Sequence, residues 1–489
     1  MSYLDGTILE IHQALVDRKT TPLELTKEAI ERAKNNPDNA FELIDEEGAI
    51  AFASALNDPE VDNLLWGIPY VAKDNFSTKG IETSASSHIL DGYVPLFDAT
   101  VIAKLKAKKC VLIGKTTMDE LAMGGSGTTG RKGITYNPYA KDHSKMMGGS
   151  SCGSAAATAA SIVPFALGSD TGDSVRKPAS FGGLVGFKPS WGRISRYGLF
   201  PFAPSLDHVA YFTRSVEDTS ILLNALAGRD DKDSTSSSKK VPEIIENDGE
   251  GLKGKRIAVI SEIMDTIHDD VFLKKFAASI EAFKKAGAVV ENVSFSRELL
   301  ESIYATYFVI SCAEATSNNA NLDGIKFGPF RGGNTYQEVM FNARTQGFSE
   351  LIKRRFVIGS FALMSENQKD LFLRAQQNRA KIVDETNKIL KDYDFIYTPA
   401  APSIAPGFHD KVNKLSDEYL IADNHLALGN FAGLPSITLP LGLEDGYPLG
   451  VNLMGRAYEE NDLLEASACI EKITGLKGLS TLNRKEGNL

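Results

Sequence analysis

The apolar and polar positions of this chain form two patterns, helical spacing and short apolar runs, and each pattern predicts one kind of element. Residues 20–36, TTPLELTKEAIERAKNN, place apolar side chains at helical spacing. Thr21 and Glu24 have the spacing of a capping box, and Pro22 stands at the first helical position, where its missing N–H costs nothing. These signals predict an amphipathic helix.

Short apolar runs that end in turn signals predict buried strands between such helices. LLWGIPYVAKDNF turns at 67–69 and then runs into Lys73. CVLIGK follows a helical segment, and RIAVIS begins at residue 256 after a polar stretch. Helices that alternate with buried strands are typical of α/β layer architectures, so we predict an α/β fold.

Two long regions depart from this alternation. Residues 229–255 are polar, charged and serine-rich, which is typical of a linker or surface loop. Residues 270–395 carry mostly helical patterning, and we interpret them as a lid over the sheet. We expect one domain over 1–489, with its core in 1–228 and 256–489.

Composition and charge narrow the classes of function. The net charge of −10 and the pI near 5.4 argue against direct binding of nucleic acid, which needs a basic surface. A local basic patch or a partner protein could still provide contact with nucleic acid. The four cysteines form no C-x-x-C pair, so we expect neither disulfides nor zinc, and a reducing compartment. We see no signal peptide and no apolar run long enough to span a bilayer. We expect a cytoplasmic globular protein.

Serine, glycine and alanine concentrate in residues 148–178, GGSSCGSAAATAASIVPFALGSDTGDSVRKP, which contain no histidine. A serine hydroxyl is a poor nucleophile until a base removes its proton. A lysine can be that base when burial lowers its pKa towards neutrality. Lys73 follows an apolar run that tends to bury its end, although a snorkelling lysine is the simpler interpretation.

The glycines of this stretch allow the backbone to approach a ligand closely. The amide N–H groups of TGDS, residues 171–174, are candidates for an oxyanion hole. The simpler interpretation is a pair of Gly-Ser loops. We favour the functional interpretation because the two clusters bracket an alanine-rich segment that would hold both of them rigidly.

Two short motifs nearby lack the context that their usual functions require. GSGTTG, residues 125–130, fits a dinucleotide fingerprint, but no clear strand precedes it and no clear helix follows it. GSSCG, residues 149–153, fits a nucleophile elbow with Ser151 at its tip, but polar residues stand where the elbow needs a buried strand. The seven histidines show no ligand spacing. We therefore interpret GSGTTG as a glycine-rich loop, disfavour an α/β-hydrolase and expect no metal site.

The longer pattern is more specific. GGSSCGSAAATAA…ALGSDTGDSVRKPASFGGLVGFKPSWGRISRYGL resembles the signature of the amidase signature family, whose usual form is close to GGSSGGSA…GSDTGGSIRxPA…GxxGxKP. LWGIPYVAKDNF is similar to the upstream lysine motif of that family, and the similarity covers nearly the whole chain. The resemblance implies the family's fold, in which helices flank a central, mixed and twisted sheet.

The resemblance also implies a Ser-cisSer-Lys catalytic unit, which needs no histidine. By motif position, Ser174 is the nucleophile, Ser150 is the bridging serine and Lys73 is the base. The peptide between Gly149 and Ser150 is expected to be cis. Ser151 and Ser154 are expected to be structural hydroxyls. The expected oxyanion hole consists of the N–H groups of Thr171, Gly172, Asp173 and Ser174.

Within the family, the chain is most similar to the subunits that hydrolyse glutamine for tRNA-dependent amidation, for example in GRISRYGLFPFAPSLDHVAYFTRSVED and NFAGLPSITLPLG. By position, Asp423 matches the acid that pairs with the α-amino group of glutamine. Arg355 matches the arginine that pairs with the α-carboxylate, and the adjacent Arg354 is an alternative. A guanidinium holds a carboxylate bidentately, whereas the simpler interpretation of each residue is a surface charge.

This resemblance implies that the chain supplies ammonia to a partner subunit, which amidates Glu-tRNA(Gln) or Asp-tRNA(Asn). The partner would contact the tRNA and bind ATP and Mg²⁺, and a small third subunit would complete a heterotrimer. We expect no cofactor in this chain. The alternatives are a stand-alone amidase that acts on simple or aryl amides, and a scaffold that has lost catalysis.

Two residues depart from the family pattern. Cys152 replaces a glycine of GGSSGGS, and Asp173 replaces the second glycine of TGGS. An inward carboxylate at Asp173 would oppose the negative charge that develops on the oxyanion. An outward carboxylate would cost only the flexibility of glycine. We expect the outward orientation, because the three catalytic residues are kept.

Overall fold

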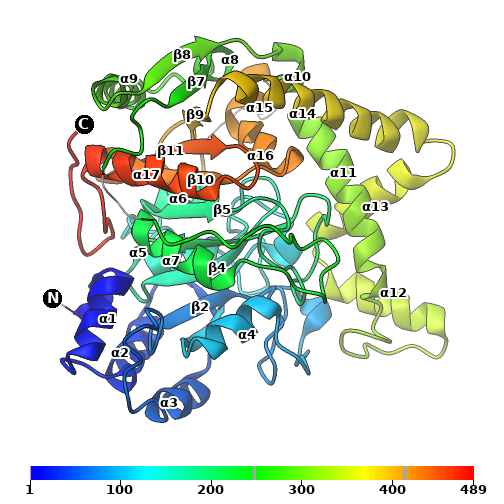
Figure 1. The fold of residues 1–489 in the computed structure, drawn as a ribbon. Helices are drawn as coiled ribbons and strands as arrows, with labels where there is room; N and C mark the ends of the chain where they lie inside the picture. The colour runs from blue at the N-terminus through cyan, green and yellow to red at the C-terminus, as the bar shows by residue number, and fades with distance from the viewer. Residues whose placement is uncertain (1, 246–248, 411–415) are drawn as a thin grey trace.

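The computed structural model describes residues 2–245, 249–410 and 416–489. In these ranges, an 11-stranded mixed sheet runs through the protein in the order β1-β3-β2-β4-β6-β5-β10-β11-β9-β7-β8 (Figure 1). The strands are β1 (Phe41–Ile44), β2 (Pro69–Lys73), β3 (Val111–Thr116), β4 (Phe165–Asp170), β5 (Val185–Lys188), β6 (His208–Thr213), β7 (Arg256–Ile260), β8 (Val289–Val293), β9 (Phe395–Pro399), β10 (Ser436–Glu444) and β11 (Tyr447–Gly455). The predicted α/β fold with a mixed sheet is confirmed.

Helices cover both faces of this sheet. Along β7, Ile257 and Val259 join one hydrophobic cluster, whereas Ala258 and Ile260 join a second. Alternate side chains of a strand point to opposite faces, so both faces are buried. The α-helices are α1 (Ile8–Val16), α2 (Pro22–Lys34), α3 (Glu46–Ser54), α4 (Thr100–Ala107), α5 (Cys152–Ala159), α6 (Arg176–Gly182), α7 (Val216–Leu226), α8 (Ser261–Met264), α9 (Asp270–Lys285), α10 (Arg297–Glu301), α11 (Ile303–Asn318), α12 (Tyr336–Gly347), α13 (Glu350–Leu363), α14 (Arg374–Asp392), α15 (Asp417–Asn424), α16 (Leu428–Phe431) and α17 (Glu460–Thr474).

Local sequence signals account for several of these elements. The predicted capping box is present at the start of α2, where the Thr21 side chain accepts the N–H of Glu24 and the Glu24 carboxylate accepts the N–H of Thr21. The turn before β2 uses Gly67, whose φ of +72° lies in the left-handed region that favours glycine. The predicted helix and strand between residues 100 and 116 are also present, as α4 and β3.

The arrangement of β2 and β4 positions the serine-rich region. These two strands are parallel neighbours, with Val71 opposite Ala166, so their carboxyl ends lie at the same edge of the sheet. Helix α5 follows the first serine cluster and packs against both strands with all of its residues buried. The alanine side chains of α5 permit this close approach. The alanine-rich segment therefore does join the two clusters through the core.

Helices α11 to α14 lie together at one side of the sheet (Figure 1). They pack through the second hydrophobic cluster, and α11 contacts both α13 and α14. The role of this region as a lid, and the single-domain division with a surface loop at 229–255, stay predictions. In the described ranges, no helix is long and apolar enough to cross a membrane.

Candidate active site

Lys73 is the last residue of β2, and its side chain is completely buried. Its Nζ donates hydrogen bonds to the hydroxyls of Ser150 (2.7 Å), Ser151 (3.0 Å) and Ser169 (2.9 Å). A snorkelling lysine would reach water, so that interpretation is wrong. Burial disfavours the charged form and lowers the pKa of Lys73 from 10.5 to about 8. A lysine in this environment loses its proton far more readily than an exposed one.

Asp119 packs against the loop that carries Ser150. The peptide between Gly149 and Ser150 is cis, as the resemblance implied. A Cβ at Gly149 would overlap the Asp119 carboxylate, so only glycine fits there. The same carboxylate accepts the N–H groups of Gly127 and Thr128, each at 3.0 Å. GSGTTG is a loop, as predicted, and its hydrogen bonds to Asp119 connect it to the serine site.

Ser174 lies in the turn between β4 and α6, and the turn is fixed by a buried ion pair. Asp170, at the end of β4, accepts the N–H of Val175 (3.0 Å) and pairs with Arg176 (2.9 Å). Burial opposes the charge of Asp170, but Arg176 holds the pKa of this carboxyl below its usual range. The Ser151 N–H donates to the Ser174 carbonyl at 3.2 Å and ties the two serine loops together.

The structure joins two of the three predicted catalytic residues directly. Lys73 and Ser150 are hydrogen-bonded, whereas the Ser174 hydroxyl makes no hydrogen bond with Ser150 in the described ranges. Catalytic hydrogen bonds are often long in a free enzyme and tighten when substrate binds. Ser174 is 4% exposed. Its turn is hydrogen-bonded to Ser151, which directly follows Ser150 in the chain.

The backbone of this turn offers unpaired donors. The N–H groups of Gly172, Asp173 and Ser174 donate to no other group in the described part of the chain. Thr171 contributes a further anchor, because its hydroxyl donates to Asp207 at 2.7 Å. An added Cβ at Gly172 would come within 3.1 Å of the Tyr307 ring of α11. Glycine therefore lets α11 approach a turn whose N–H groups have the character of an oxyanion hole.

The carboxylate of Asp173 has a partner that the two orientations considered from the sequence did not include. Its φ is not in the left-handed region, so the glycine that it replaces is not required for backbone reasons. Its carboxylate lies 2.6 Å from Nζ of Lys177, one helical turn further on, and is 21% exposed. Burial raises the pKa of Asp173, and Lys177 opposes that shift. The carboxylate is therefore directed to an ion pair and not simply to solvent.

Asp423, the candidate partner of a substrate α-amino group, belongs to the same ion-pair cluster. Lys177 Nζ donates to the Asp423 carboxylate and to the Asp423 carbonyl, each at 2.9 Å. Burial works against the charge of Lys177, but Asp173 and Asp423 together raise its pKa. The structure thus brings Asp423 beside the residue that precedes the candidate nucleophile.

Arg355 lies on α13, outside that cluster. Its guanidinium stacks over the ring of Phe308 at 5.1 Å, and its buried Nη1 has no hydrogen-bond partner among the described residues. Burial raises the pKa of Tyr307, Arg355 lowers it and Asp173 raises it, so Tyr307 lies near both charges. Arg354, the alternative, is exposed. The structure favours Arg355 over Arg354 as an anion-binding residue but does not join it to Asp423.

Sequence reasoning missed three residues that line this site. Ser169 contacts Lys73 and also accepts from Asn75 at 2.9 Å. Ser151 was expected to be only structural, but it contacts Lys73 as well. Ser151 does donate to the backbone of Ser169 at 3.1 Å, and Ser154 donates to Leu167, as expected of structural hydroxyls. The other missed residues are Lys177 and Tyr307. Lys177 had a signal, because it stands four residues after Asp173 on a helix.

Cys152, the other departure from the family pattern, begins α5 and is buried. Its Sγ lies 3.7 Å from the carbonyl of Thr117. Burial raises the pKa of the Cys152 thiol to about 12, which makes it a poor nucleophile. Cys152 is therefore a packing residue behind the serine loop.

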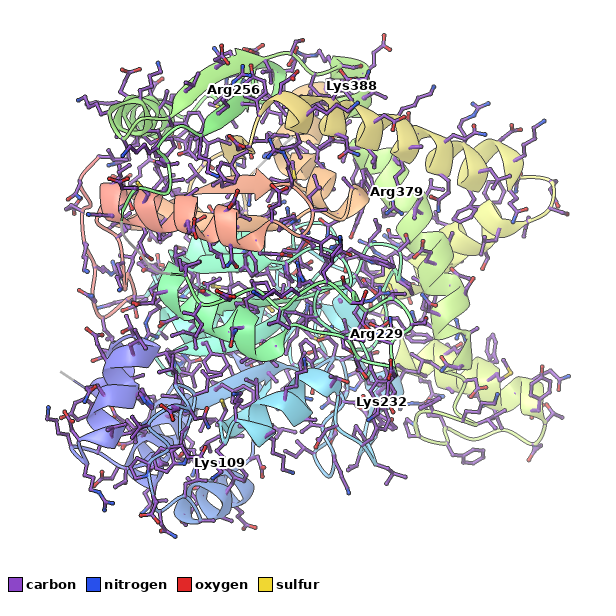
Figure 2. The ribbon with its side chains drawn as sticks, in the orientation of Figure 1. Lys109, Arg229, Lys232, Arg256, Arg379 and Lys388 are labelled. Carbon is purple, nitrogen blue, oxygen red and sulfur yellow. The ribbon has the colours of Figure 1, made fainter. Side chains whose placement is uncertain are left out.

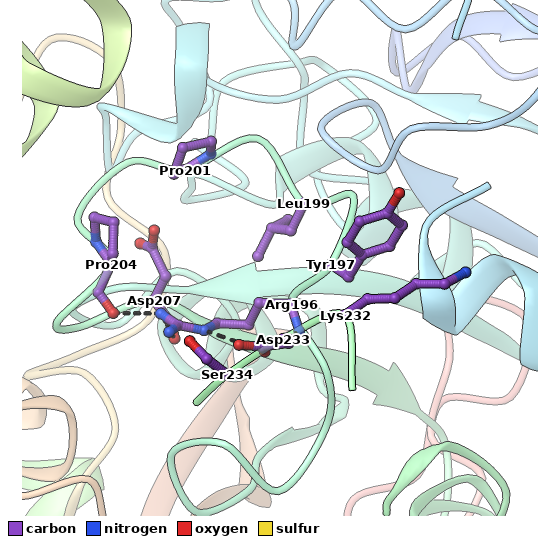
Figure 3. A pocket seen from close by; sticks show the side chains of 9 residues that line it. All are labelled: Arg196, Tyr197, Leu199, Pro201, Pro204, Asp207, Lys232, Asp233 and Ser234. Atoms are coloured by element: carbon purple, nitrogen blue, oxygen red, sulfur yellow. Dashed lines mark hydrogen bonds and ion pairs between the residues drawn. The ribbon is translucent and has the colours of Figure 1, made fainter. Parts of the chain in front are cut away.

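A separate cavity of about 250 Å³ lies beside Arg196 and Asp207 (Figure 3). Arg196 lies in it and is directed at the Pro204 carbonyl and at Asp233. Asp207 connects the cavity to the turn through its hydrogen bond with Thr171. Its lining residues are Arg196, Tyr197, Leu199, Pro201, Pro204, Asp207, Lys232, Asp233 and Ser234. This cavity is thus distinct from the serine–lysine site.

A buried lysine bonded to serines, beside a turn whose N–H groups have no partner among the described residues, is typical of serine hydrolases that work without histidine. Residues 24–464 match the model of the Amidase family, and the chain belongs to that family. It is 41% identical over 482 residues to the A subunit of glutamyl-tRNA(Gln) amidotransferase from Streptococcus thermophilus (strain CNRZ 1066), and the match covers 97% of each protein.

Solved structures of related proteins have the same fold. The A subunit of glutamyl-tRNA(Gln) amidotransferase from Thermotoga maritima aligns with a TM-score of 0.79 and 35% identity, over 96% of this chain and 95% of that one. The peptide amidase of Stenotrophomonas maltophilia aligns with a TM-score of 0.80 and 25% identity, over 99% of each chain. The predicted amidase signature resemblance is confirmed, and the chain is an amidase-type enzyme.

Proposed function

We propose that this chain hydrolyses glutamine to glutamate and ammonia, and that a partner subunit uses the ammonia to amidate Glu-tRNA(Gln) or Asp-tRNA(Asn). The observation that carries the proposal is the buried contact between Lys73 and Ser150, next to the turn of Ser174. The relatives named as amidotransferase A subunits, which match almost the full length of the chain, support the choice of reaction.

In the proposed mechanism, neutral Lys73 accepts a proton through Ser150 from the hydroxyl of Ser174. The Ser174 oxygen then attacks the carbon of the side-chain amide, and the N–H groups of the turn hold the oxyanion. The relay returns the proton to the amide nitrogen, the C–N bond breaks and ammonia leaves. Water then hydrolyses the glutamyl ester through the same relay, which restores Ser174.

The surroundings of Lys73 support its role as a base. Its hydrogen-bond partners are the hydroxyls of Ser150, Ser151 and Ser169 and, at 3.4 Å, the backbone carbonyl of Ser169. These neutral groups orient Nζ without stabilising a positive charge as a carboxylate would. A pKa of about 8 leaves a useful fraction of Lys73 neutral near neutral pH.

The pocket also supports glutamine as the substrate. In the proposal, Asp423 pairs with the α-ammonium group and Arg355 pairs with the α-carboxylate. The buried Nη1 of Arg355 has no hydrogen-bond partner among the described residues, which supports this role, because a buried polar group is costly without a partner. A stand-alone amidase for simple or aryl amides has no use for this pair of charges, so we favour glutamine over that alternative.

We further propose that the chain works in a heterotrimer with the amidotransferase B and C subunits. The B subunit would contact the tRNA and hold ATP and Mg²⁺, and this chain would need no cofactor. Its net charge of −10 supports indirect contact with tRNA. The six cationic side chains labelled in Figure 2 come from β7, from α14 and from loops. Helices α12 and α13 expose Phe341, Val357 and Phe361, and exposed apolar patches are typical of proteins that bind partners.

Ammonia release by the purified chain, alone and with its B and C subunits, tests this proposal. The substrates are glutamine, glutaramate (the same amide without the α-amino group), acetamide and benzamide. We expect slow turnover restricted to glutamine that increases when the partners are added. Rapid cleavage of the simple amides with glutamine ignored would instead establish a stand-alone amidase.

The same assay tests the scaffold alternative. Ser174→Ala removes the proposed nucleophile without changing the size of the turn. We expect this variant to release no ammonia and to fail to support glutamine-dependent amidation by the complex. If the Ser174→Ala complex still amidates tRNA from glutamine at the normal rate, catalysis by this chain is not its function.

A further inference from the structure

Gly172 and Asp173 share a peptide group whose carbonyl is held by a side chain. Nη2 of Arg176 donates to the Gly172 oxygen at 2.7 Å, and no backbone N–H in the described ranges donates to that oxygen. In a regular helix, the N–H of Arg176 would be its partner. That N–H is instead directed at the Asp170 carboxylate, at 3.4 Å. The direction of the Gly172 carbonyl therefore depends on the Arg176 guanidinium.

The next peptide group is held by the helix itself. The Asp173 carbonyl accepts the N–H of Lys177 at 2.9 Å, at the start of α6. In a trans peptide the C=O and N–H groups point in opposite directions, and the only cis peptide in the described ranges is Gly149–Ser150. The helix thus sets the direction of the Ser174 N–H, whereas Arg176 sets that of the Asp173 N–H. Both N–H groups have no partner in the described part of the chain.

The Arg176 guanidinium is itself held on several sides. Its side chain is completely buried and pairs with Asp170 through Nε (3.1 Å) and Nη2 (2.9 Å). Nη1 donates to the Leu426 carbonyl at 2.7 Å, and Nη2 also donates to Oδ1 of Asn430 at 2.6 Å. A planar guanidinium bonded in several directions cannot rotate without losing several hydrogen bonds. The Gly172 carbonyl therefore faces a donor of fixed position.

We propose that Arg176 is a positioning residue of the oxyanion hole. By holding the Gly172 carbonyl, it directs the N–H of Asp173 to the negative oxygen that forms when the nucleophile attacks. Asp173 contributes only its backbone, so its carboxylate is free to pair with Lys177. The inference rests on the proposed mechanism, in which Ser174 attacks a carbonyl carbon, and not on glutamine as the substrate.

A purely structural role of the buried ion pair is the competing explanation. A structural defect weakens all ligands of the site alike, whereas loss of an oxyanion donor weakens only ligands that form the oxyanion. The aldehyde 5-oxopentanoate forms it when Oγ of Ser174 bonds to the aldehyde carbon. The serine proton then passes through Ser150 to Lys73, and the carbonyl electron pair moves onto the oxygen. Glutarate, the corresponding acid, has the same carbon chain and does not react.

The test compares the dissociation constants of these two compounds in the full-length chain. Each constant is measured as protection of Ser174 from labelling by phenylmethanesulfonyl fluoride, so the readout needs no turnover of glutamine. Arg176→Lys keeps a positive charge beside Asp170 but loses the planar fork that also holds the Gly172 carbonyl. We expect the aldehyde constant to rise about tenfold or more relative to that of glutarate, and kcat for glutamine to fall about 10²-fold with KM within about threefold.

Asn430→Ala is the matched control. It removes another acceptor of the same Nη2 and leaves the Gly172 contact in place, so we expect the ratio of the two constants to stay within about threefold of the wild type. If Arg176→Lys does not fold, Asp170→Asn/Arg176→Gln replaces the ion pair with two neutral amides and buries no unpaired charge. Glutamine is too short to hold the Gly172 carbonyl, so the same rise is expected.

Three results would overturn the inference. The first is an unchanged ratio in the folded Arg176 variant, the second is an equal rise in Asn430→Ala, and the third is a wild-type protein that binds the aldehyde no more tightly than glutarate. A wild-type protein that binds the aldehyde tightly but does not hydrolyse glutamine would contradict the proposed substrate. The ratio would still decide the role of Arg176 in that case, because it is measured without glutamine.

Discussion

Lys73 and Lys177 are both buried next to the Ser174 turn, yet their surroundings give them opposite properties. Three neutral hydroxyls surround Lys73, and burial lowers its pKa to about 8. Two carboxylates hold Lys177, and they raise its pKa although burial opposes them. Burial alone therefore does not make a lysine a base. The partners decide whether the lysine accepts protons or anchors charges.

This difference assigns the two lysines to separate tasks. A base must give up its charge during each turnover, so it needs acceptors that do not stabilise the ammonium strongly. A positioning residue must keep its charge, and carboxylates within 3 Å ensure this. The same turn thus carries the proposed catalytic relay on one side and the proposed α-ammonium site on the other.

The largest effect is expected when the same conservative substitution is made at both lysines. Lys73→Arg replaces the base with a guanidinium that stays protonated, and we expect kcat for glutamine to fall by about 10³-fold or more. Lys177→Arg, the matched control, keeps a positive charge between the two carboxylates, and we expect a loss of about tenfold or less. Steady-state ammonia release measures both values.

Melting curves of both variants must accompany these rates, because arginine is larger than lysine and could destabilise the fold at a buried position. The comparison fails if the two variants, both folded, lose activity to the same extent. It also fails if Lys73→Arg keeps more than a tenth of the wild-type kcat.

A smaller effect is expected on stability. Lys177→Gln removes the ammonium that pairs with both Asp173 and Asp423, and both carboxylates are partly buried. We expect the free energy of unfolding to fall by about 1–3 kcal/mol, as measured by urea denaturation at pH 7. Asp173→Asn/Lys177→Gln removes one of the two opposed carboxylates and should recover part of that loss. If Lys177→Gln is as stable as the wild type, the carboxylates do not depend on Lys177.

The smallest effect is expected at Ser169. Its hydroxyl orients Lys73 together with Ser150 and Ser151, and it takes no part in the proposed proton relay. We expect Ser169→Ala to lower kcat about two- to tenfold, since one oriented hydrogen bond to Nζ is lost. Ser154→Ala is a suitable control, because Ser154 bonds the backbone of β4 and not Lys73. Equal effects of the two substitutions would show that Ser169 acts only in packing.

Much of this site is predictable from the sequence because it depends on local order along the chain. The glycine and serine spacing of residues 148–178, with the lysine motif upstream, identified Lys73, Ser150 and Ser174 by resemblance. The apolar run before Lys73 indicated that the lysine is buried. The same kind of local signal predicted β2, which carries Lys73, and α2, which packs against β2.

The Lys177 cluster was not predictable in the same way. Asp423 is 246 residues away from Lys177 in the chain, and only the tertiary fold brings α15 next to α6. The two orientations considered for Asp173 both left out Lys177 as a partner, because they described the carboxylate only by its direction relative to the oxyanion. A long-range ion pair of this kind has no periodicity that marks it in the sequence.

The central claim, that neutral Lys73 activates Ser174, is tested most directly by labelling the nucleophile at different pH values. Phenylmethanesulfonyl fluoride forms a sulfonyl ester with an activated serine, and peptide mass spectrometry identifies the modified residue. We expect the label on Ser174, with a rate that rises with pH and levels off above an apparent pKa of about 8, as Lys73 loses its proton. A label on another serine, or a rate that follows an ordinary lysine pKa near 10.5, would contradict this account.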